Sequence, residues 1–367
     1  MTRPSLAPIA AALSDTVPFV GPEALERRLG QTFLARLGAN ENPFGAAPTA
    51  LAAMAEALSA GWKYGDPENH DLRLALARHH AIPSDAIVIG EGIDGLLGLA
   101  VRLYAAPGAT IVSSLGAYPT LNYHAAGFGA EVVSVPYHEN AEDLMALATT
   151  ARRERASIVY LANPDNPMGS WHSAQAVTQF IDAVPPSTLI LLDEAYGEFA
   201  PPGTLPPLDT DRPNLLRLRT FSKAYGMAGL RCGYAIGERQ TIAAFERVRN
   251  HFGVNAVAQA GAIAAIAAPE HLDQVVQLTA ASRARIVQIA RDNGLTPLPS
   301  ATNFVTIDCG RDASHASGIL TALAARRIFI RKPMASGLDH CIRISVGTPA
   351  DLDMLATELP QAIAAAG

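Results

Sequence analysis

The sequence predicts an α/β fold in which a mostly parallel sheet is flanked by helices. Short apolar, β-rich runs recur at residues 86–90, 110–113, 130–135, 157–162 and 189–192, with helical stretches between them. Strands that alternate with helices form crossover units, and crossover units give parallel sheets. The runs at 157–162 and 189–192 stop at polar residues, as strands do where such a sheet faces a ligand. A length of 367 residues exceeds one typical core and suggests two domains.

The C-terminal third of the chain predicts a second, smaller unit. Segments 255–268 and 270–293 are expected to be long helices, and segments 302–307 and 341–346 are expected to be strands. The first 45 residues or so are expected to form an irregular arm with one short helix. The predicted organisation is an N-terminal arm over 1–45, a large ligand-binding domain over 46–262 and a smaller α+β domain over 263–367. The arm is expected to pack with the small domain.

Composition excludes several classes of partner. The net charge is −6 and no basic run occurs, which argues against nucleic acid and anionic membranes as partners. The three cysteines are scattered and odd in number, and the ten histidines show no spacing suited to a metal, so neither a disulfide framework nor a metal site is expected. The first thirty residues do not resemble a signal peptide, and no uninterrupted apolar run reaches membrane-spanning length. A cytoplasmic location is therefore expected.

The segment Thr-Phe-Ser-Lys-Ala-Tyr-Gly at 220–226 is the most informative in the chain. A lysine such as Lys223 can form a Schiff base with an aldehyde if its surroundings keep the amine partly unprotonated. Ser222 and Arg231 are residue types that hold a phosphate, through a hydroxyl and a guanidinium fork. An aldehyde and a phosphate occur together on pyridoxal 5′-phosphate (PLP). Taken alone, the motif is better explained as a surface lysine in a glycine-rich loop.

Two other strand ends supply groups that suit this cofactor. Asp193 follows the aliphatic residues 189–192, and a carboxylate there can keep the pyridine nitrogen protonated. Tyr196, three residues on, and Asn166, in the turn 163–169, can hydrogen-bond the phenolic oxygen of the ring. Each motif alone has an ordinary explanation, as a helix-capping Asp or a plain turn. Together, three strand-end motifs in this order are specific.

In these motifs the chain resembles the fold-type I PLP-dependent aminotransferases of classes I and II. The motifs are N-P-D-N-P-M-G at 163–169, D-E-A-Y at 193–196, T-F-S-K-A-Y-G-M-A-G-L-R-C-G at 220–233 and I-R-I-S-V-G-T at 342–348. The segments A-N-E-N-P-F-G at 39–45 and Y-G-D-P at 64–67, followed by L-R at 72–73, point to the histidinol-phosphate aminotransferase branch. The match extends from about residue 17 to the C-terminus. It implies the fold-type I transferase architecture, with the large domain binding PLP.

The resemblance also implies further residues that bind the cofactor. Tyr118 would stack on the pyridine ring. The turn at Gly92, Ile93 and Asp94, between a strand and a helix, would offer backbone N–H groups to the phosphate. Tyr64 would reach the phosphate of the neighbouring subunit's cofactor, which implies a homodimer with shared active sites. Ordinary positions in a core, a tight turn or a surface loop remain the alternatives for these residues.

Substrate binding is expected to rest on arginines. Arg343 is the best candidate for the substrate α-carboxylate, because a guanidinium fork binds and orients a carboxylate with two hydrogen bonds. Asn40 would assist at the same carboxylate. Arg331 matches a second family arginine near the substrate side chain, although it lies close to Arg326 and Arg327 and all three could be solvated.

Four positions depart from the family pattern. Ile93 stands where a small or hydroxyl residue is usual, which removes a side-chain hydroxyl contact but keeps the backbone contacts. Gly95 stands where an acidic residue is usual, and Met168 replaces a common threonine beside the cofactor. Phe19 stands where a tyrosine is frequent, so that one substrate-side hydrogen bond lacks its donor.

The implied activity is PLP-dependent transfer of an amino group between histidinol phosphate or an L-amino acid and 2-oxoglutarate, in amino acid metabolism and specifically in histidine biosynthesis. The catalytic residues would be Lys223 as cofactor anchor and general base, Asp193 and Tyr196. Two alternatives with the same fold stay open: an aromatic amino acid aminotransferase, and a decarboxylase of a phosphorylated amino acid like the threonine-phosphate decarboxylases. A PLP-binding regulator would call for a DNA-binding domain, which the sequence does not suggest.

Overall fold

The structure is a computed structural model that describes residues 3–14 and 20–367. Phe19 lies outside the described residues. The strands are β1 (Ala35–Arg36), β2 (Ile87–Gly90), β3 (Thr110–Ser114), β4 (Glu131–Val135), β5 (Ile158–Ala162), β6 (Leu189–Asp193), β7 (Leu215–Thr220), β8 (Gly233–Gly237), β9 (Thr296–Pro297), β10 (Phe304–Asp308), β11 (Ile328–Phe329) and β12 (Cys341–Ser345). The helices are α1 (Pro8–Ala11), α2 (Pro22–Leu29), α3 (Pro48–Leu58), α4 (His70–His80), α5 (Gly92–Tyr104), α6 (Thr120–Gly127), α7 (Leu144–Arg153), α8 (Ala174–Ala183), α9 (Arg239–Phe245), α10 (Ala256–Ile266), α11 (Pro269–Asp292), α12 (Ala313–Ala325) and α13 (Pro349–Ala365).

The large sheet has the strand order β2-β8-β7-β6-β5-β3-β4 among the described residues. Strands β7, β6, β5, β3 and β4 are parallel, and β8 runs antiparallel to both of its neighbours. Successive residues of a central strand face opposite layers: Leu191 packs with the α5 and α6 layer, while Ile190 and Leu192 pack with α7 and α8. Both faces of the sheet are therefore covered, which explains the continuous apolar runs. The predicted α/β fold with a mostly parallel sheet is confirmed.

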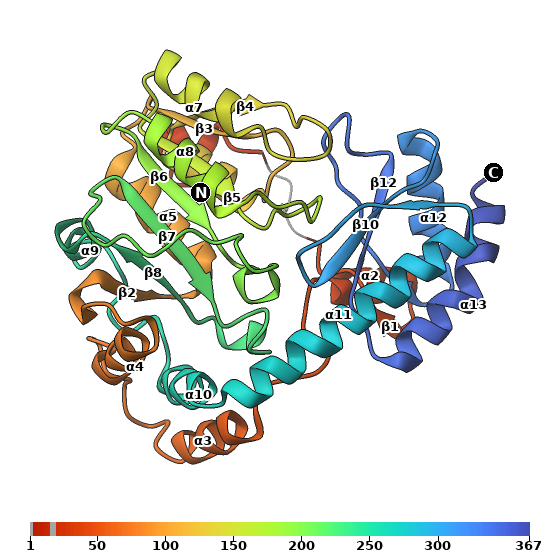
Figure 1. Cartoon of the computed structure of the whole chain (residues 1–367), viewed down its shortest axis with the longest axis horizontal. Coiled ribbons are helices and arrows are strands. Elements are labelled where there is room, and N and C mark those ends of the chain that lie inside the picture. Colours follow the sequence, from red (N-terminus) through yellow and green to blue (C-terminus); the bar gives the residue numbers. More distant parts are fainter. Residues whose placement is uncertain (1–2, 15–19) are drawn as a thin grey trace.

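A smaller antiparallel sheet, β9-β10-β12, packs with the C-terminal helices α11, α12 and α13. The long helix α11 extends from the side of α3 and α10 to the small sheet (Figure 1). Arm residues Ala35 and Leu37 lie in the core of this second unit, and β1 pairs with β11. The domain boundaries at 45 and 262 stay a prediction; residue 262 lies inside α10.

Local expectations differ from the structure in the arm and in several strands. In its described residues the arm contains two helices, α1 and α2, and the short strand β1, where one short helix is predicted. Strands β7, β8, β9 and β11 are not among the predicted strands; in β7, Arg217 and Arg219 interrupt the apolar pattern. Among the described residues, no helix is long and apolar enough to cross a membrane.

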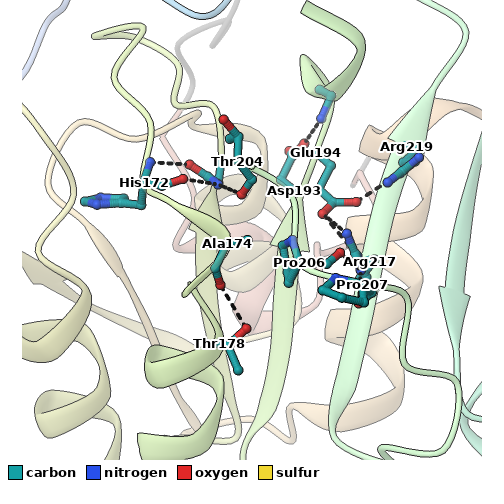
Figure 2. Close-up of polar contacts among 12 residues, drawn as sticks. His172, Ala174, Thr178, Asp193, Glu194, Thr204, Pro206, Pro207, Arg217 and Arg219 are labelled. Atoms are coloured by element: carbon teal, nitrogen blue, oxygen red, sulfur yellow. Dashed lines mark hydrogen bonds and ion pairs between the residues drawn. The ribbon is translucent and has the colours of Figure 1, made fainter. Parts of the chain in front are cut away.

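Arg217 is tolerated in the interior because it belongs to a buried ion cluster beside the end of β6. Arg217 and Glu194 are 1% and 0% exposed, and Arg217 Nε donates to Glu194 Oε1 at 3.0 Å. Arg219 Nε donates to the other carboxylate oxygen at 2.9 Å, and Arg217 Nη1 donates to the carbonyls of Pro206 and Pro207. Figure 2 shows the Glu194 carboxylate between the two guanidinium groups. The cluster thereby joins β7 to the residue that directly follows Asp193.

We expect Arg217→Ala to lower the free energy of unfolding by about 3–5 kcal/mol, because it leaves buried charge without its main partner. Chemical denaturation of the variant and the wild type measures this difference. Arg239→Ala is the matched control: Arg239 pairs with Asp85 at 3.1 Å, but its side chain is 78% exposed. Its loss should stay below about 1 kcal/mol. Similar losses in both variants would contradict a special contribution from the buried cluster.

Candidate active site

A cavity of about 680 Å³ lies at the carboxyl ends of β3, β5, β6 and β7. In a parallel sheet this edge is where ligands bind. The cavity brings together most of the residues predicted from sequence: Asn40, Ile93, Asp94, Tyr118, Asn166, Asp193, Tyr196, Ser222, Lys223, Arg231, Arg331 and Arg343. Gly92 and Tyr64 are the two predicted residues that do not line it.

The Lys223 amine lies in this cavity, where Nζ donates to the Asn40 carbonyl at 3.2 Å and is 5.6 Å from the Tyr196 ring centroid. Burial, followed by the charge of Arg343, lowers the pKa of Lys223 from 10.5 to about 8. A useful fraction of the amine is therefore neutral near neutral pH, which a lysine nucleophile or base requires.

Asp193 is the last residue of β6 and is 5% exposed. Its carboxylate accepts hydrogen bonds from Tyr160 Oη at 2.7 Å and from the Ala195 amide at 2.9 Å. Burial raises the pKa of Asp193 to about 6, and the two hydrogen bonds oppose that rise. A cation placed against this carboxylate would restore its charged form. Tyr160 was not predicted as a site residue, because a hydroxyl within an apolar strand looks like core.

One corner of the cavity has the chemistry of a phosphate site. Ser222 Oγ lies 3.4 Å from Arg231 Nη1, and Thr220 Oγ1 donates to Ser222 Oγ at 3.0 Å. Gly92, with a φ of +75°, leaves room for the guanidinium: a Cβ there would come within 2.7 Å of Arg231 Nη2. Asp94 Oδ2 pairs with the same nitrogen at 3.2 Å, and the Arg231 side chain is 47% exposed. Gly92 therefore shapes this corner without lining it, and Thr220 is a member that sequence analysis missed.

Asn40 joins the arm to both halves of the molecule. Its Nδ2 donates to Tyr196 Oη at 3.0 Å, and its Oδ1 accepts from Ser345 Oγ at 2.8 Å. The residue adopts a left-handed backbone, with φ 54°, and Asn303 Nδ2 donates to its carbonyl at 3.0 Å. Asn is among the residues that tolerate this conformation. In this structure the side chain orients Tyr196, a role not foreseen from sequence.

The opposite corner carries two guanidinium groups. Arg343 donates to Asn166 Oδ1 through Nη1 and lies 5.0 Å from the Phe304 ring centroid. Its Nε is buried and has no hydrogen-bond partner. Arg331 is joined to Arg343 by paired backbone hydrogen bonds of 3.2 and 2.7 Å, and its Nη2 donates to the Val20 carbonyl at 2.8 Å. Two cations and an unused buried donor make this corner suitable for an anionic substrate group.

Three further predicted positions have clear surroundings. Tyr118 lines the cavity, and burial raises its pKa to about 12, so that it stays neutral near neutral pH. Met168 is 1% exposed and packs on Leu338 and Cys341, which explains how an apolar residue fits where threonine is common. Gly95 lies in the first turn of α5, where a Cβ would meet the Glu91 side chain at 3.2 Å.

Tyr64 lies away from the cavity of its own chain. It is 84% exposed, in the connection between α3 and α4, and its ring centroid is 4.9 Å from that of Phe252. The connection is well held, because Gln259 Nε2 donates to the Asp66 carbonyl at 3.2 Å and Arg249 Nη2 donates to the Pro67 carbonyl at 2.5 Å.

Behind the cavity lies a second buried carboxylate, Asp165. It accepts from Tyr137 Oη at 2.8 Å and from the Met168 amide at 2.9 Å, and it is 1% exposed. Burial raises the pKa of Asp165 from 3.8 to about 7. Within residues 3–14 and 20–367, no group of His, Cys, Asp or Glu is placed to hold a metal ion.

Comparison with known proteins places this arrangement among aminotransferases. Residues 34–359 match the family model "Aminotransferase class I and II". The chain is 37% identical to histidinol-phosphate aminotransferase 2 of Ralstonia nicotianae, covering 91% of each chain. It is also 37% identical to histidinol-phosphate aminotransferase 1 of Mesorhizobium japonicum, over 98% of this chain and 96% of that one. The crystal structure of histidinol-phosphate aminotransferase from Sinorhizobium meliloti in complex with PLP has a TM-score of 0.97 and 51% identity, covering 100% of this chain and 99% of that chain.

The raised pKa of Asp165 predicts a pH-dependent difference between Asp165→Asn and the wild type. Because the folded-state pKa lies above the unfolded value, the native state binds the proton more tightly, and this contribution to stability is lost as pH rises from about 4 to about 7. The Asn variant has no such proton. Its free energy of unfolding, relative to wild type, should therefore rise by up to about 4 kcal/mol between these pH values.

Denaturation curves at pH 4, 5.5 and 7 measure this difference. Any loss from the changed hydrogen bonds is a constant offset and does not alter the trend with pH. The control is Asp211→Asn, which removes an exposed carboxylate. Curves for Asp165→Asn that run parallel to the wild type would refute the raised pKa.

Proposed function

We propose that this chain, which belongs to the aminotransferase class I and II family, is a PLP-dependent aminotransferase that takes histidinol phosphate as its amino donor and 2-oxoglutarate as its acceptor. The observation that carries the proposal is one cavity that holds the Lys223 amine and the Asp193 carboxylate together with three arginines. Arg231 lies at the phosphate corner, and Arg331 and Arg343 lie at the opposite corner. The 37% identical relatives support the choice of donor.

The residues of the cavity fit PLP. The space that Gly92 leaves beside the Arg231 guanidinium, together with Ser222, suits the cofactor phosphate. Asp193 suits the ring nitrogen, and Tyr118 suits the ring face. Tyr196 and the Nδ2 group of Asn166 would bind the phenolic oxygen, since Asn166 Oδ1 already accepts from Arg343. When bound, PLP supplies an electron sink for the substrate carbon that carries the amino group.

Lys223 is the residue that anchors the cofactor and moves the proton at that carbon. Its pKa of about 8 leaves part of the amine unprotonated at neutral pH, as a base requires. Asp193 stabilises positive charge at the ring nitrogen, because an adjacent carboxylate favours the charged form. Asn40 holds Tyr196 in place through the 3.0 Å hydrogen bond from Nδ2.

Arg343 and Arg331 would bind the anionic group of each substrate in turn. Histidinol phosphate has no α-carboxylate, so its phosphate ester would occupy the corner that receives the α-carboxylate of glutamate. The buried Arg343 Nε, without a hydrogen-bond partner, supports this assignment, because a buried donor gains most from an anionic acceptor. The relatives do not favour the two alternatives, an aromatic amino acid aminotransferase and a decarboxylase of a phosphorylated amino acid.

A homodimer with shared sites is part of the proposal. Leu58, Trp62, Tyr64 and Phe252 are 68%, 82%, 84% and 51% exposed around one well-held connection. An exposed apolar group on a rigid connection is typical of an interface. We propose that it packs on a second copy and that Tyr64 binds the cofactor phosphate there. A cytoplasmic location is also proposed, supported by three free, buried cysteines.

The donor is tested by measuring kcat/KM with histidinol phosphate, phenylalanine, tyrosine and threonine phosphate, each with 2-oxoglutarate. Histidinol phosphate should exceed the two aromatic amino acids in kcat/KM by about tenfold or more, because its phosphate ester carries more negative charge and more acceptor oxygens for Arg331 and Arg343 than a single α-carboxylate does. Lys223→Ala is the control and should show no turnover. Preference for phenylalanine or tyrosine would favour the aromatic aminotransferase, and release of CO₂ from threonine phosphate would favour the decarboxylase.

The shared site is tested by mixing two inactive variants, Lys223→Ala and a Tyr64 variant that no longer retains PLP. In a mixed dimer, one site has its own Lys223 and a normal Tyr64 from the partner, so activity should return toward one working site per dimer. Tyr64→Phe alone should weaken PLP binding by about tenfold to a hundredfold, whereas the neighbouring Trp62→Phe should not. If subunits exchange and no activity returns, Tyr64 acts within its own chain.

A further inference from the structure

Another buried carboxylate, Glu142, lies in the connection between β4 and α7 and is 1% exposed. Its Oε1 accepts a hydrogen bond from the Ala162 amide at 2.9 Å, and its Oε2 accepts one from Ser114 Oγ. Both donors lie at strand ends, since Ser114 is the last residue of β3 and Ala162 is the last residue of β5. The carboxylate therefore bridges the two strand ends.

These two strands separate before they end. The register pairs Ile111 with Ile158 and Val112 with Val159, and the strands then continue to Ser114 and Ala162 without further pairs. On its other side β5 stays paired with β6 as far as Ala162 and Asp193. The Glu142 carboxylate lies in the opening between the ends of β3 and β5. The Ala162 amide therefore donates to Glu142 Oε1 and not to a carbonyl of β3.

The same connection also holds the turn that follows β5. Tyr137 Oη donates to Asp165 Oδ1 at 2.8 Å, and the Glu142 carbonyl is 2.9 Å from His172 Nε2. The segment from Ala162 to His172 is therefore attached to residues 137–142 at three points. This segment presents Asn166 to the cavity.

The end of β5 is also what orients Asp193. Tyr160, two residues before Ala162, donates to Asp193 Oδ2 at 2.7 Å. A shift of the strand end would move this hydroxyl and the turn that carries Asn166 together. The phosphate corner is supported separately, because Ser222 and Arg231 lie in the connection between β7 and β8. Ser222 accepts a hydrogen bond from Thr220, and Arg231 donates one to the Ala228 carbonyl.

We propose that Glu142 is a positioning residue that sets the ring-binding half of the cavity: by closing the opening between β3 and β5 it fixes Tyr160 on Asp193 and Asn166 at the cavity wall. The proposal rests on the proposed function, because the ring it serves is that of PLP. It concerns Glu142 alone and leaves the phosphate corner unaffected.

Glutamine should replace Glu142 well, whereas alanine should not. Burial, and then the neighbouring charge of Asp165, raises the pKa of Glu142, so the site favours an uncharged side chain. Gln keeps an oxygen for the Ala162 amide and a polar group for the Ser114 hydroxyl. Ala leaves the buried Ala162 amide without an acceptor, and the strand end must move to find one.

The test compares Glu142→Ala, Glu142→Gln and the control Glu139→Ala, an exposed residue of the same connection, as holoenzymes. The measurements are the PLP dissociation constant, the pH at which the visible absorbance of bound PLP changes, and kcat and KM separately. We expect Glu142→Ala to weaken PLP binding by about tenfold, to shift the pH midpoint of the absorbance change and to lower kcat more than it changes KM. The PLP dissociation constant and kcat of Glu142→Gln should stay within about threefold of the wild-type values, and those of Glu139→Ala should equal the wild-type values.

A folded Glu142→Ala protein with wild-type PLP affinity and an unshifted absorbance midpoint would overturn the proposal, even if its melting temperature fell. If that variant does not fold, Ser114→Ala removes one of the two hydrogen bonds to the Glu142 carboxylate and should shift the same midpoint; a wild-type midpoint in Ser114→Ala would overturn the proposal equally. The PLP measurements need no amino donor. A wild type that binds PLP but does not use histidinol phosphate would therefore refute the proposed donor and leave the test of Glu142 intact.

Discussion

Asp193, which is buried, and Lys223, which is half-buried, lie in one cavity, and each is a costly group to remove from water. Burial raises the pKa of Asp193 to about 6 and lowers that of Lys223 to about 8. Both shifts favour the neutral form of the group. A cation bound beside Asp193 would lower its pKa again, and a neutral Lys223 amine can attack an electrophilic carbonyl. The rest of the site depends on this constraint: Tyr160 and the Ala195 amide donate to Asp193, and the Asn40 carbonyl accepts from Lys223.

The support for this pair comes from several directions. Tyr160 on β5 donates to Asp193, and the arm residue Asn40 accepts from Lys223 through its carbonyl. Asn40 is in turn held by Ser345 on β12 and by Asn303 next to β10. Lys223 therefore contacts the arm, and the arm contacts the small sheet. A shift of the small sheet would therefore reach Lys223 through the hydrogen bonds from Ser345 to Asn40 and from Lys223 to the Asn40 carbonyl.

Buried charge recurs behind the cavity in two different forms. Glu194 forms ion pairs with Arg217 and Arg219. Glu142 and Asp165 have hydroxyl and amide donors, and burial raises the pKa of both. The ion pairs of Glu194 join the end of β6 to β7. Glu142 bridges the ends of β3 and β5, and Asp165 holds the turn that follows β5. Together they fix the strand ends between which the cavity forms.

The fold class and the ends of β5 and β6 could be read from the sequence, with the polar residues that follow them. Asp193 and Asn166 could be proposed together because the carboxyl ends of neighbouring parallel strands meet at one edge of the sheet. This rule makes short motifs far apart in the chain converge. Lys223 and Arg231 joined them through chemistry, since an amine suits an aldehyde and a guanidinium suits a phosphate. The family resemblance added Tyr118, Arg343 and Asn40.

Only the tertiary structure decided which side chains support those residues. Tyr160 and Glu142 look like an ordinary core residue and an ordinary loop residue, and Arg217 made β7 difficult to recognise as a buried strand. Their roles depend on partners 33, 20 and 23 positions away in the chain. A hydrogen bond is made within about 3 Å, and that proximity comes from strand register and from the course of each connection. The sequence pattern specifies which face of a strand is buried, but not which polar atom it meets there.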